Sequence, residues 1–193
     1  MRKVISIDST YMSDKIRKCI KRALERVYEN DSQLICFGPN IEDWKRLYNI
    51  REDDEAEVFH VSERGIVFRF GHYLQELDKE FPFLRDYSID MEYNRHLISP
   101  KVLPDWKNGC VPDLIIHRRN DDTANLFVVE FKTWWNTSRD QDIKKLHQLM
   151  DTHGKYKYHF AAAILLEKRL EDCKIHFIAS DFPEEMEYTF KAL

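Results

Sequence analysis

The stretch VPDLIIHRRNDDTANLFVVEFK, residues 111–132, contains two apolar runs separated by a polar segment. Residues 111–116 and 126–131 are apolar almost throughout, which is typical of central strands that are covered on both faces. Residues 120–123 (NDDT) between them are turn-forming types. The pattern predicts an antiparallel hairpin near the centre of a β-sheet.

The second apolar run ends in two charged residues, Glu130 and Lys132, where a buried strand ordinarily carries none. Because side chains alternate across a strand, this spacing of two puts both on one face. A turn centred between Asp121 and Asp122 would pair residues whose numbers sum to 243, and it would place Asp113 opposite Glu130. Two facing carboxylates repel unless a cation lies between them, and a divalent metal ion or the Lys132 ammonium would supply that charge.

Periodic patterns on both sides of the hairpin predict further helices and strands. Apolar residues recur at helical spacing after Ser13 and again after Ser62, each of which can act as an N-cap, and Gly154 can end a third helix. The expected helices are residues 13–29, 62–81 and 140–153, and the expected further strands are residues 89–94, 158–166 and 173–179. Residues 32–37 fit a short strand or a buried connector, and a short helix is expected near Trp44.

The order of these elements is helix, helix, three strands, helix, two strands. It predicts an α/β fold with a mixed central β-sheet flanked by helices. A chain of 193 residues with 43% apolar content suits one hydrophobic core, and no segment has the composition of a linker. We therefore expect a single domain over residues 1–193, with an N-terminal helical extension at 1–61, a core at 62–179 and a C-terminal segment at 180–193.

Composition predicts a cytoplasmic protein without a membrane partner. The longest apolar run, residues 160–166, is far shorter than the ~20 residues that span a bilayer, and no secretory signal is visible. The four cysteines form no CxxC pair, so reduced thiols are expected. A net charge of −4 argues against nucleic-acid binding by charge alone. Residues 111–169 nevertheless carry 10 bases and 8 acids, so any nucleic-acid contacts are expected there.

Glu63 can supply a third carboxylate near the same point. It lies in the first turn of the second expected helix, on the apolar side shared by Ile66 and Phe70. Three carboxylates and Lys132 would form an oxygen-rich site that suits Mg²⁺ or Mn²⁺ better than zinc. Taken singly, the Glu-x-Lys pair fits a salt-bridged strand edge and Glu63 fits an acid that stabilises a helix start. Their conjunction favours a metal site.

Pro112-Asp113 followed by Glu130-Phe131-Lys132, with Glu63 on a helix upstream, resembles the motif of the PD-(D/E)XK superfamily, the restriction-endonuclease-like nucleases. The resemblance covers residues 62–179, and the surrounding segments look like those of small stand-alone bacterial members. It implies a restriction-endonuclease-like core. Residues 1–61 show no such resemblance.

The resemblance implies a metal-dependent nuclease that hydrolyses phosphodiester bonds, with DNA as the expected substrate. Asp113 and Glu130 would ligate one or two Mg²⁺ ions, for which Mn²⁺ can substitute, together with the backbone carbonyl of Phe131. Glu63 would reach the metal directly or through water, and Lys132 would orient the attacking water. A metal ion in such a site lowers the pKa of its water and neutralises charge on the phosphoryl oxygens.

Further residues are candidates for contact with nucleic acid. Lys144 and Gln148 lie one turn apart on the third expected helix, Trp134 could stack on a base, and Arg118 and Arg119 form a basic strand end. Each also has a structural explanation, because a helix face is ordinarily solvated and tryptophan is more often packed than stacked on a ligand. The sequence leaves both interpretations, nucleic-acid contact and a structural role, open.

Two other classes of protein fit parts of the sequence. One is a catalytically inactive nuclease-fold module that binds nucleic acid or protein, and the other is an unrelated α/β adaptor whose Glu130–Lys132 pair is structural. No GxSxG, HExxH, GxGxxG or phosphate-loop pattern is present, which excludes the commonest competing enzyme classes. With no appended recognition domain visible, specificity is expected from loops, from residues 1–61, from a homodimer or from a partner protein.

Overall fold

The computed structural model describes residues 9–36, 41–51, 63–180 and 182–192. Its main sheet has six strands in the order β1-β4-β5-β6-β7-β8, and β2 and β3 form a separate pair. The strands are β1 (Ser88–Met91), β2 (Arg95–His96), β3 (Ser99–Pro100), β4 (Leu114–Arg118), β5 (Asp121–Thr133), β6 (Phe160–Leu166), β7 (Lys174–Ala179) and β8 (Phe182–Thr189). The helices are α1 (Ser9–Asn30), α2 (Ile41–Tyr48), α4 (Glu63–Glu76) and α5 (Asp140–Met150).

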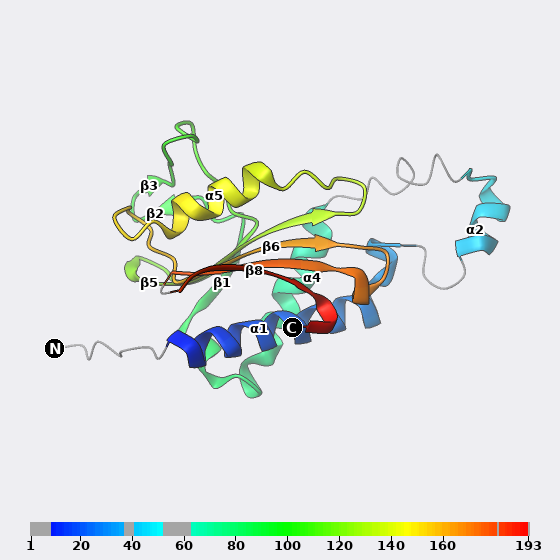
Figure 1. Ribbon diagram of the computed structural model, residues 1–193, viewed down its shortest axis with the longest axis horizontal. Helices are drawn as coiled ribbons and strands as arrows, with labels where there is room; N and C mark the ends of the chain where they lie inside the picture. Colours follow the sequence, from blue (N-terminus) through cyan, green and yellow to red (C-terminus); the bar gives the residue numbers. More distant parts are fainter. Residues whose placement is uncertain (1–8, 37–40, 52–62, 181, 193) are drawn as a thin grey trace.

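Helices cover both faces of the main sheet. Figure 1 shows α1 and α4 on one face and α5 on the other. Each face has its own apolar core: Phe70 of α4 packs edge-on against Phe131 of β5, with ring centroids 4.9 Å apart, while Leu146 and Leu149 of α5 pack on the opposite face. The expected α/β class with helices around a central sheet is therefore confirmed.

The sheet is mixed because α5 connects two parallel strands. β5 and β6 are parallel, as a helical crossover requires, and the other neighbouring strands are antiparallel. Along β5, Phe127, Val129 and Phe131 enter the α1/α4 core, whereas Val128 enters the α5 core. By the same alternation, Glu130 and Lys132 leave the sheet on the α5 face.

The predicted register of the hairpin is right, although the predicted turn is wrong. Leu114 pairs with Val129, so the residue numbers sum to 243 as expected. The turn, however, lies before Asp121, at Asn120, whose φ of 61° is the left-handed conformation that asparagine tolerates. Because the turn comes early, β5 has more residues than β4 between the turn and the paired Ile116 and Phe127. Irregular pairing on both sides of His117 accommodates these residues, so that the expected register holds from Ile116 onward.

Several other expected boundaries shift. The segment at residues 32–37 is no strand, because Ser32–Leu34 forms a 3-10 turn and Ile35 is a buried connector, while residue 37 lies outside the described residues. Ser62, the expected N-cap, also lies outside them. The short helix near Trp44 is confirmed as α2, and α4 ends at Glu76 before a further 3-10 turn.

Part of the sheet and the small β2–β3 pair were not predicted. β8 lies in the C-terminal segment and pairs with β7, which extends the sheet beyond the five expected strands. In the described part of the chain, every helix is too short or too polar to cross a membrane.

Two glycines of α4 offer a matched test of packing between this helix and the sheet. A Cβ on Gly71 would lie 2.8 Å from Leu114 Cδ1, whereas a Cβ on Gly65 would have nothing within 4 Å. We expect Gly71→Ala to lower the free energy of unfolding by about 1–3 kcal/mol, because overpacking exceeds the gain in helix propensity. Gly65→Ala is expected to be neutral or stabilising by about 0.5 kcal/mol. Urea denaturation measures both, and equal stabilities would contradict the tight helix–sheet contact.

Candidate functional site

Glu130 is a charged residue inside the sheet, with a relative exposure of 2%. Its Oε2 forms an ion pair with Lys145 Nζ of α5 at 2.5 Å. Its Oε1 is buried and has no hydrogen-bond partner. Burial and, to a smaller extent, the nearby Asp113 raise the pKa of Glu130 to about 8, against the opposing effect of Lys145. One oxygen of this carboxylate is thus left available to a ligand.

Asp113 lies beside Glu130, as the register predicts. Its Oδ2 accepts a hydrogen bond of 2.7 Å from the backbone N–H of Phe131, so the residue just before β4 is tied to the end of β5. Burial raises the pKa of Asp113, although the Phe131 N–H and the lysines Lys145 and Lys132 work against the increase. The buried carboxylates of Asp113 and Glu130 therefore lie close together, and a further cation beside them would favour their ionised forms.

Lys132 contacts two further carboxylates of the site, those of Asp142 and Glu63. Its Nζ lies 3.0 Å from Asp142 Oδ2 of α5 and 3.8 Å from Glu63 Oε1, and it donates a 3.1 Å hydrogen bond to the carbonyl of Phe131. Burial tends to lower the pKa of Lys132, but Asp142, Glu63 and Asp113 together outweigh it, so the pKa is raised. Lys132 is therefore a permanent cation near neutral pH, suited to orienting water or a phosphate oxygen and unsuited to acting as a base.

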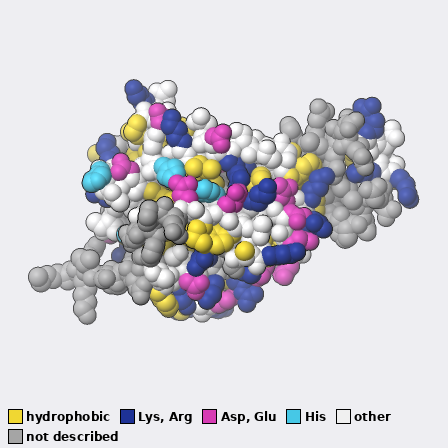
Figure 2. Space-filling model, in the orientation of Figure 1, with side chains coloured by type: hydrophobic (Ala, Val, Ile, Leu, Met, Phe, Trp, Pro, Cys, Tyr) yellow, Lys and Arg dark blue, Asp and Glu magenta, His cyan; other side chains and the backbone are white. Residues whose placement is uncertain are grey.

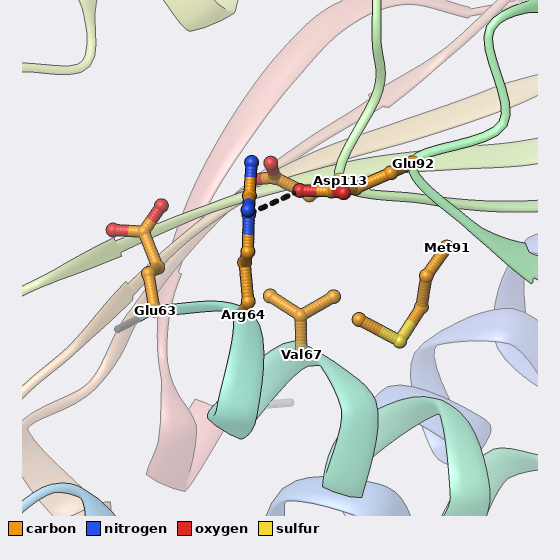
Figure 3. Close-up of a pocket in the computed structure, with 6 residues that line it drawn as sticks. All are labelled: Glu63, Arg64, Val67, Met91, Glu92 and Asp113. Atoms are coloured by element: carbon orange, nitrogen blue, oxygen red, sulfur yellow. Dashed lines mark ion pairs between the residues drawn. The ribbon is translucent and has the colours of Figure 1, made fainter. Parts of the chain in front are cut away.

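Glu63 stands at the rim of a cavity that reaches Asp113. The cavity has a volume of about 300 Å³, and its lining residues are Glu63, Arg64, Val67, Met91, Glu92 and Asp113. Figure 3 shows Glu63 and Arg64 rising from the first turn of α4, with Arg64 Nε paired to Glu92 Oε1 at 2.6 Å. Burial raises the pKa of Glu63 to about 7, with Lys132 opposing and Asp113 adding to the shift. Glu63 can therefore exchange a proton near neutral pH.

Two residues of this cluster, Asp142 and Lys145, were not among the predicted site residues. A lysine beside an apolar helix stripe ordinarily points into solvent, but the side chain of Lys145 is 13% exposed and pairs with Glu130. Asp142 is buried as well, at 7% exposure. A signal was present in the spacing: Asp142 precedes Leu146 by four residues and Leu149 by seven, so it belongs to the buried stripe of α5.

The oxygen atoms at this site are of the kind that divalent metal ions such as Mg²⁺ prefer as ligands. Asp113, Glu130 and the carbonyl of Phe131 supply hard oxygen ligands, and the unpartnered Oε1 of Glu130 is a buried oxygen that lacks a donor. Among the described residues, no three His, Cys, Asp or Glu side chains lie close enough together to hold a metal ion as they stand. Here Lys132 and Lys145 are the cations that contact these oxygens.

The predicted nucleic-acid contacts on α5 are tied to a neighbouring loop. Lys144 Nζ lies 3.1 Å from Asp105 Oδ2, and Gln148 Nε2 donates to the same carboxylate oxygen. Both side chains therefore contact this loop through Asp105. A phosphate that binds them would have to compete with Asp105.

The other predicted contacts are also engaged within the chain. The Trp134 indole N–H donates to the Ile35 carbonyl at 2.9 Å. Arg118 donates to the carbonyl of Asp86, and Arg119 pairs with Asp90. On the face shown in Figure 2, Lys and Arg side chains are interspersed with Asp and Glu and form no extended basic patch. Any nucleic-acid binding on this face would depend on local contacts more than on a broad electric field.

Comparisons with protein-family models, with curated proteins and with solved structures give no match to this chain. The resemblance to the PD-(D/E)XK superfamily therefore stays a prediction. The functional interpretation depends on the arrangement of the residues described above.

The raised pKa of Glu130 gives the stability a definite pH dependence. Between its ordinary pKa of about 4.3 and the folded value of about 8, the folded state binds more protons than the unfolded state at this site. Stability of the wild type should therefore fall relative to Glu130→Gln as pH rises from 5 to 8, by up to about 1.4 kcal/mol per pH unit. Urea unfolding in EDTA measures the difference.

Asp172→Asn is the control for this experiment. The hydrogen bond from Arg169 lowers the pKa of Asp172, so its contribution to stability is present above its ordinary pKa and is lost only as pH falls below that value. The stability difference between wild type and Asp172→Asn should thus stay constant from pH 5 to 8. A constant difference for Glu130→Gln as well would contradict the assigned burial of its charge.

Proposed function

We propose that the chain is a metal-dependent phosphodiesterase of the restriction-endonuclease-like type that acts on nucleic acid, with DNA as the substrate. The observation that carries the proposal is the buried Glu130 carboxylate beside Asp113, with one oxygen lacking any donor. Lys132, whose Nζ lies 3.0 Å from Asp142 and 3.8 Å from Glu63, supplies the cation that the proposed reaction needs beside this pair. The cavity lined by Glu63 and Asp113 gives this point an access route.

Each residue has a separate task in the proposed reaction. Asp113, Glu130 and the Phe131 carbonyl would hold a Mg²⁺ or Mn²⁺ ion, which supplies charge neutralisation on the phosphoryl oxygens and a water of lowered pKa. Lys132 donates hydrogen bonds from Nζ to the attacking water or to a phosphate oxygen, and its charge stabilises the transition state. Glu63, with a pKa near 7, can take up or release a proton at its carboxylate beside Lys132.

One specific observation favours a second candidate, a nuclease-like module that binds without cleaving. Lys145 already neutralises Glu130, and Lys132 already neutralises Asp142, so much of the negative charge is balanced without a metal ion. A binding module would keep this arrangement permanently. Specificity in either case would come from loops, from residues 1–61, from a second copy or from a partner protein.

Cleavage assays separate the two candidates. Wild-type protein should cut DNA with Mg²⁺ or Mn²⁺ and be inactive in EDTA, and single- and double-stranded DNA and RNA in parallel would define the substrate. Lys132→Ala should lower the rate by about 10²–10⁴-fold, because it removes the group that positions water. Lys18→Ala removes a lysine of α1 that is 60% exposed and pairs with Asp14, away from the proposed site, so cleavage should continue. If Lys132→Ala cuts as fast as the wild type, the proposed mechanism is wrong.

Metal binding should also be visible in thermal stability. A cation that binds only the folded carboxylate pair at ten times its Kd stabilises by about 1.4 kcal/mol, or roughly 3–6 °C in Tm for a chain of this size. We expect this shift with Mn²⁺ for the wild type and its loss in Asp113→Asn. Asp105→Asn, which alters an exposed carboxylate, should keep the shift. An equal shift in Asp113→Asn would place the metal elsewhere.

A further inference from the structure

Six ionisable side chains converge on the proposed metal site. Four are acids and two are lysines: Glu63, Asp113, Glu130, Asp142, Lys132 and Lys145. A bound divalent cation favours the ionised form of the acids around it, and with all six side chains ionised their formal charge is −2. The wider surroundings add little, because Arg64 at the cavity rim is paired with Glu92. One divalent cation would therefore bring the cluster to neutrality.

The two oxygens of Glu130 are in different situations. Oε2 is held by Lys145 at 2.5 Å, whereas Oε1 is buried without a partner. A carboxylate that bridges two metal ions with one ion on each oxygen needs both oxygens free. Here one oxygen is committed to an ammonium that is itself only 13% exposed and comes from the middle of a well-packed helix.

Lys132 cannot take over the role of Lys145. Its Nζ is already engaged with Asp142, Glu63 and the Phe131 carbonyl on the other side of the cluster. The two lysines thus serve different carboxylates, and removing Lys145 would leave Glu130 Oε2 without its cation.

We propose that Lys145 permanently fills the position of a second cation, so that the site binds a single divalent metal ion per chain, on the Oε1 side of Glu130. The inference rests on the proposed function, since it concerns the same metal site. A second divalent ion would bring the buried cluster to a formal charge of +2, and burying unbalanced charge is costly. Lys145 acts here as a positioning residue for the Glu130 carboxylate.

The experiment counts bound Mn²⁺ without nucleic acid, by titration calorimetry and by the electron paramagnetic resonance signal of free Mn²⁺. Wild type should bind one ion per chain. Lys145→Met removes the charge at similar length, frees Oε2 and lowers the cluster charge to −3, so two ions should bind. Lys145→Arg restores the charge and should return the number to one. Lys144→Met, next to it on α5 but paired with Asp105, should also bind one.

The possible results are distinct. Two ions in the wild type, or one ion in Lys145→Met at any affinity, would overturn the inference while leaving the metal-dependent function standing. No ion in any variant would overturn the proposed function together with the inference. Circular dichroism checks that Lys145→Met is folded, and Lys145→Gln, which keeps a polar group, is the second charge-removing variant and should likewise bind two ions.

Discussion

The ion pair between Glu130 and Lys145 is what allows a carboxylate to lie in the middle of the sheet. At 2% exposure, an unpaired charge there would cost several kcal/mol, so the pairing constrains where α5 can lie. With α5 placed over β5, Asp142 comes within reach of Lys132, and the crossover into β6 makes the sheet mixed. The ion pair and the apolar packing of Leu146 and Leu149 together thus fix α5 on this face of the sheet.

The register of the central hairpin could be predicted because both apolar runs require the same faces to be buried. Leu114 and Val129 are both buried in the α1/α4 core, so burial sets their pairing independently of where the turn lies. The turn itself could not be located, since asparagine and aspartate fit several turn positions equally well, and the irregular pairing around His117 absorbed the difference. Asp113 and Glu130 therefore come together for a reason visible in the sequence.

The rest of the site depended on tertiary contacts that no local pattern specifies. Lys145 is a polar residue beside an apolar stripe, and only the position of Glu130 across the interface turns it inward. Arg118 and Arg119 form a basic cluster in sequence, but Asp86 and Asp90 engage them in the fold. β8 was missed because its charged residues suit an edge strand as well as they suit a solvated tail.

The hydrogen bond from Trp134 to the Ile35 carbonyl bears on whether the nuclease-like core could exist alone. Trp134 follows Lys132 by two residues, and Ile35 is fully buried, so the end of β5 is tied to the N-terminal part of the chain. The buried face of α1, including Ile20, also completes the core beneath α4. The described residues of the expected N-terminal extension, α1 and Ile35 among them, thus belong to the same core as α4 and β5, and a chain cut to residues 62–179 would leave that apolar surface uncovered.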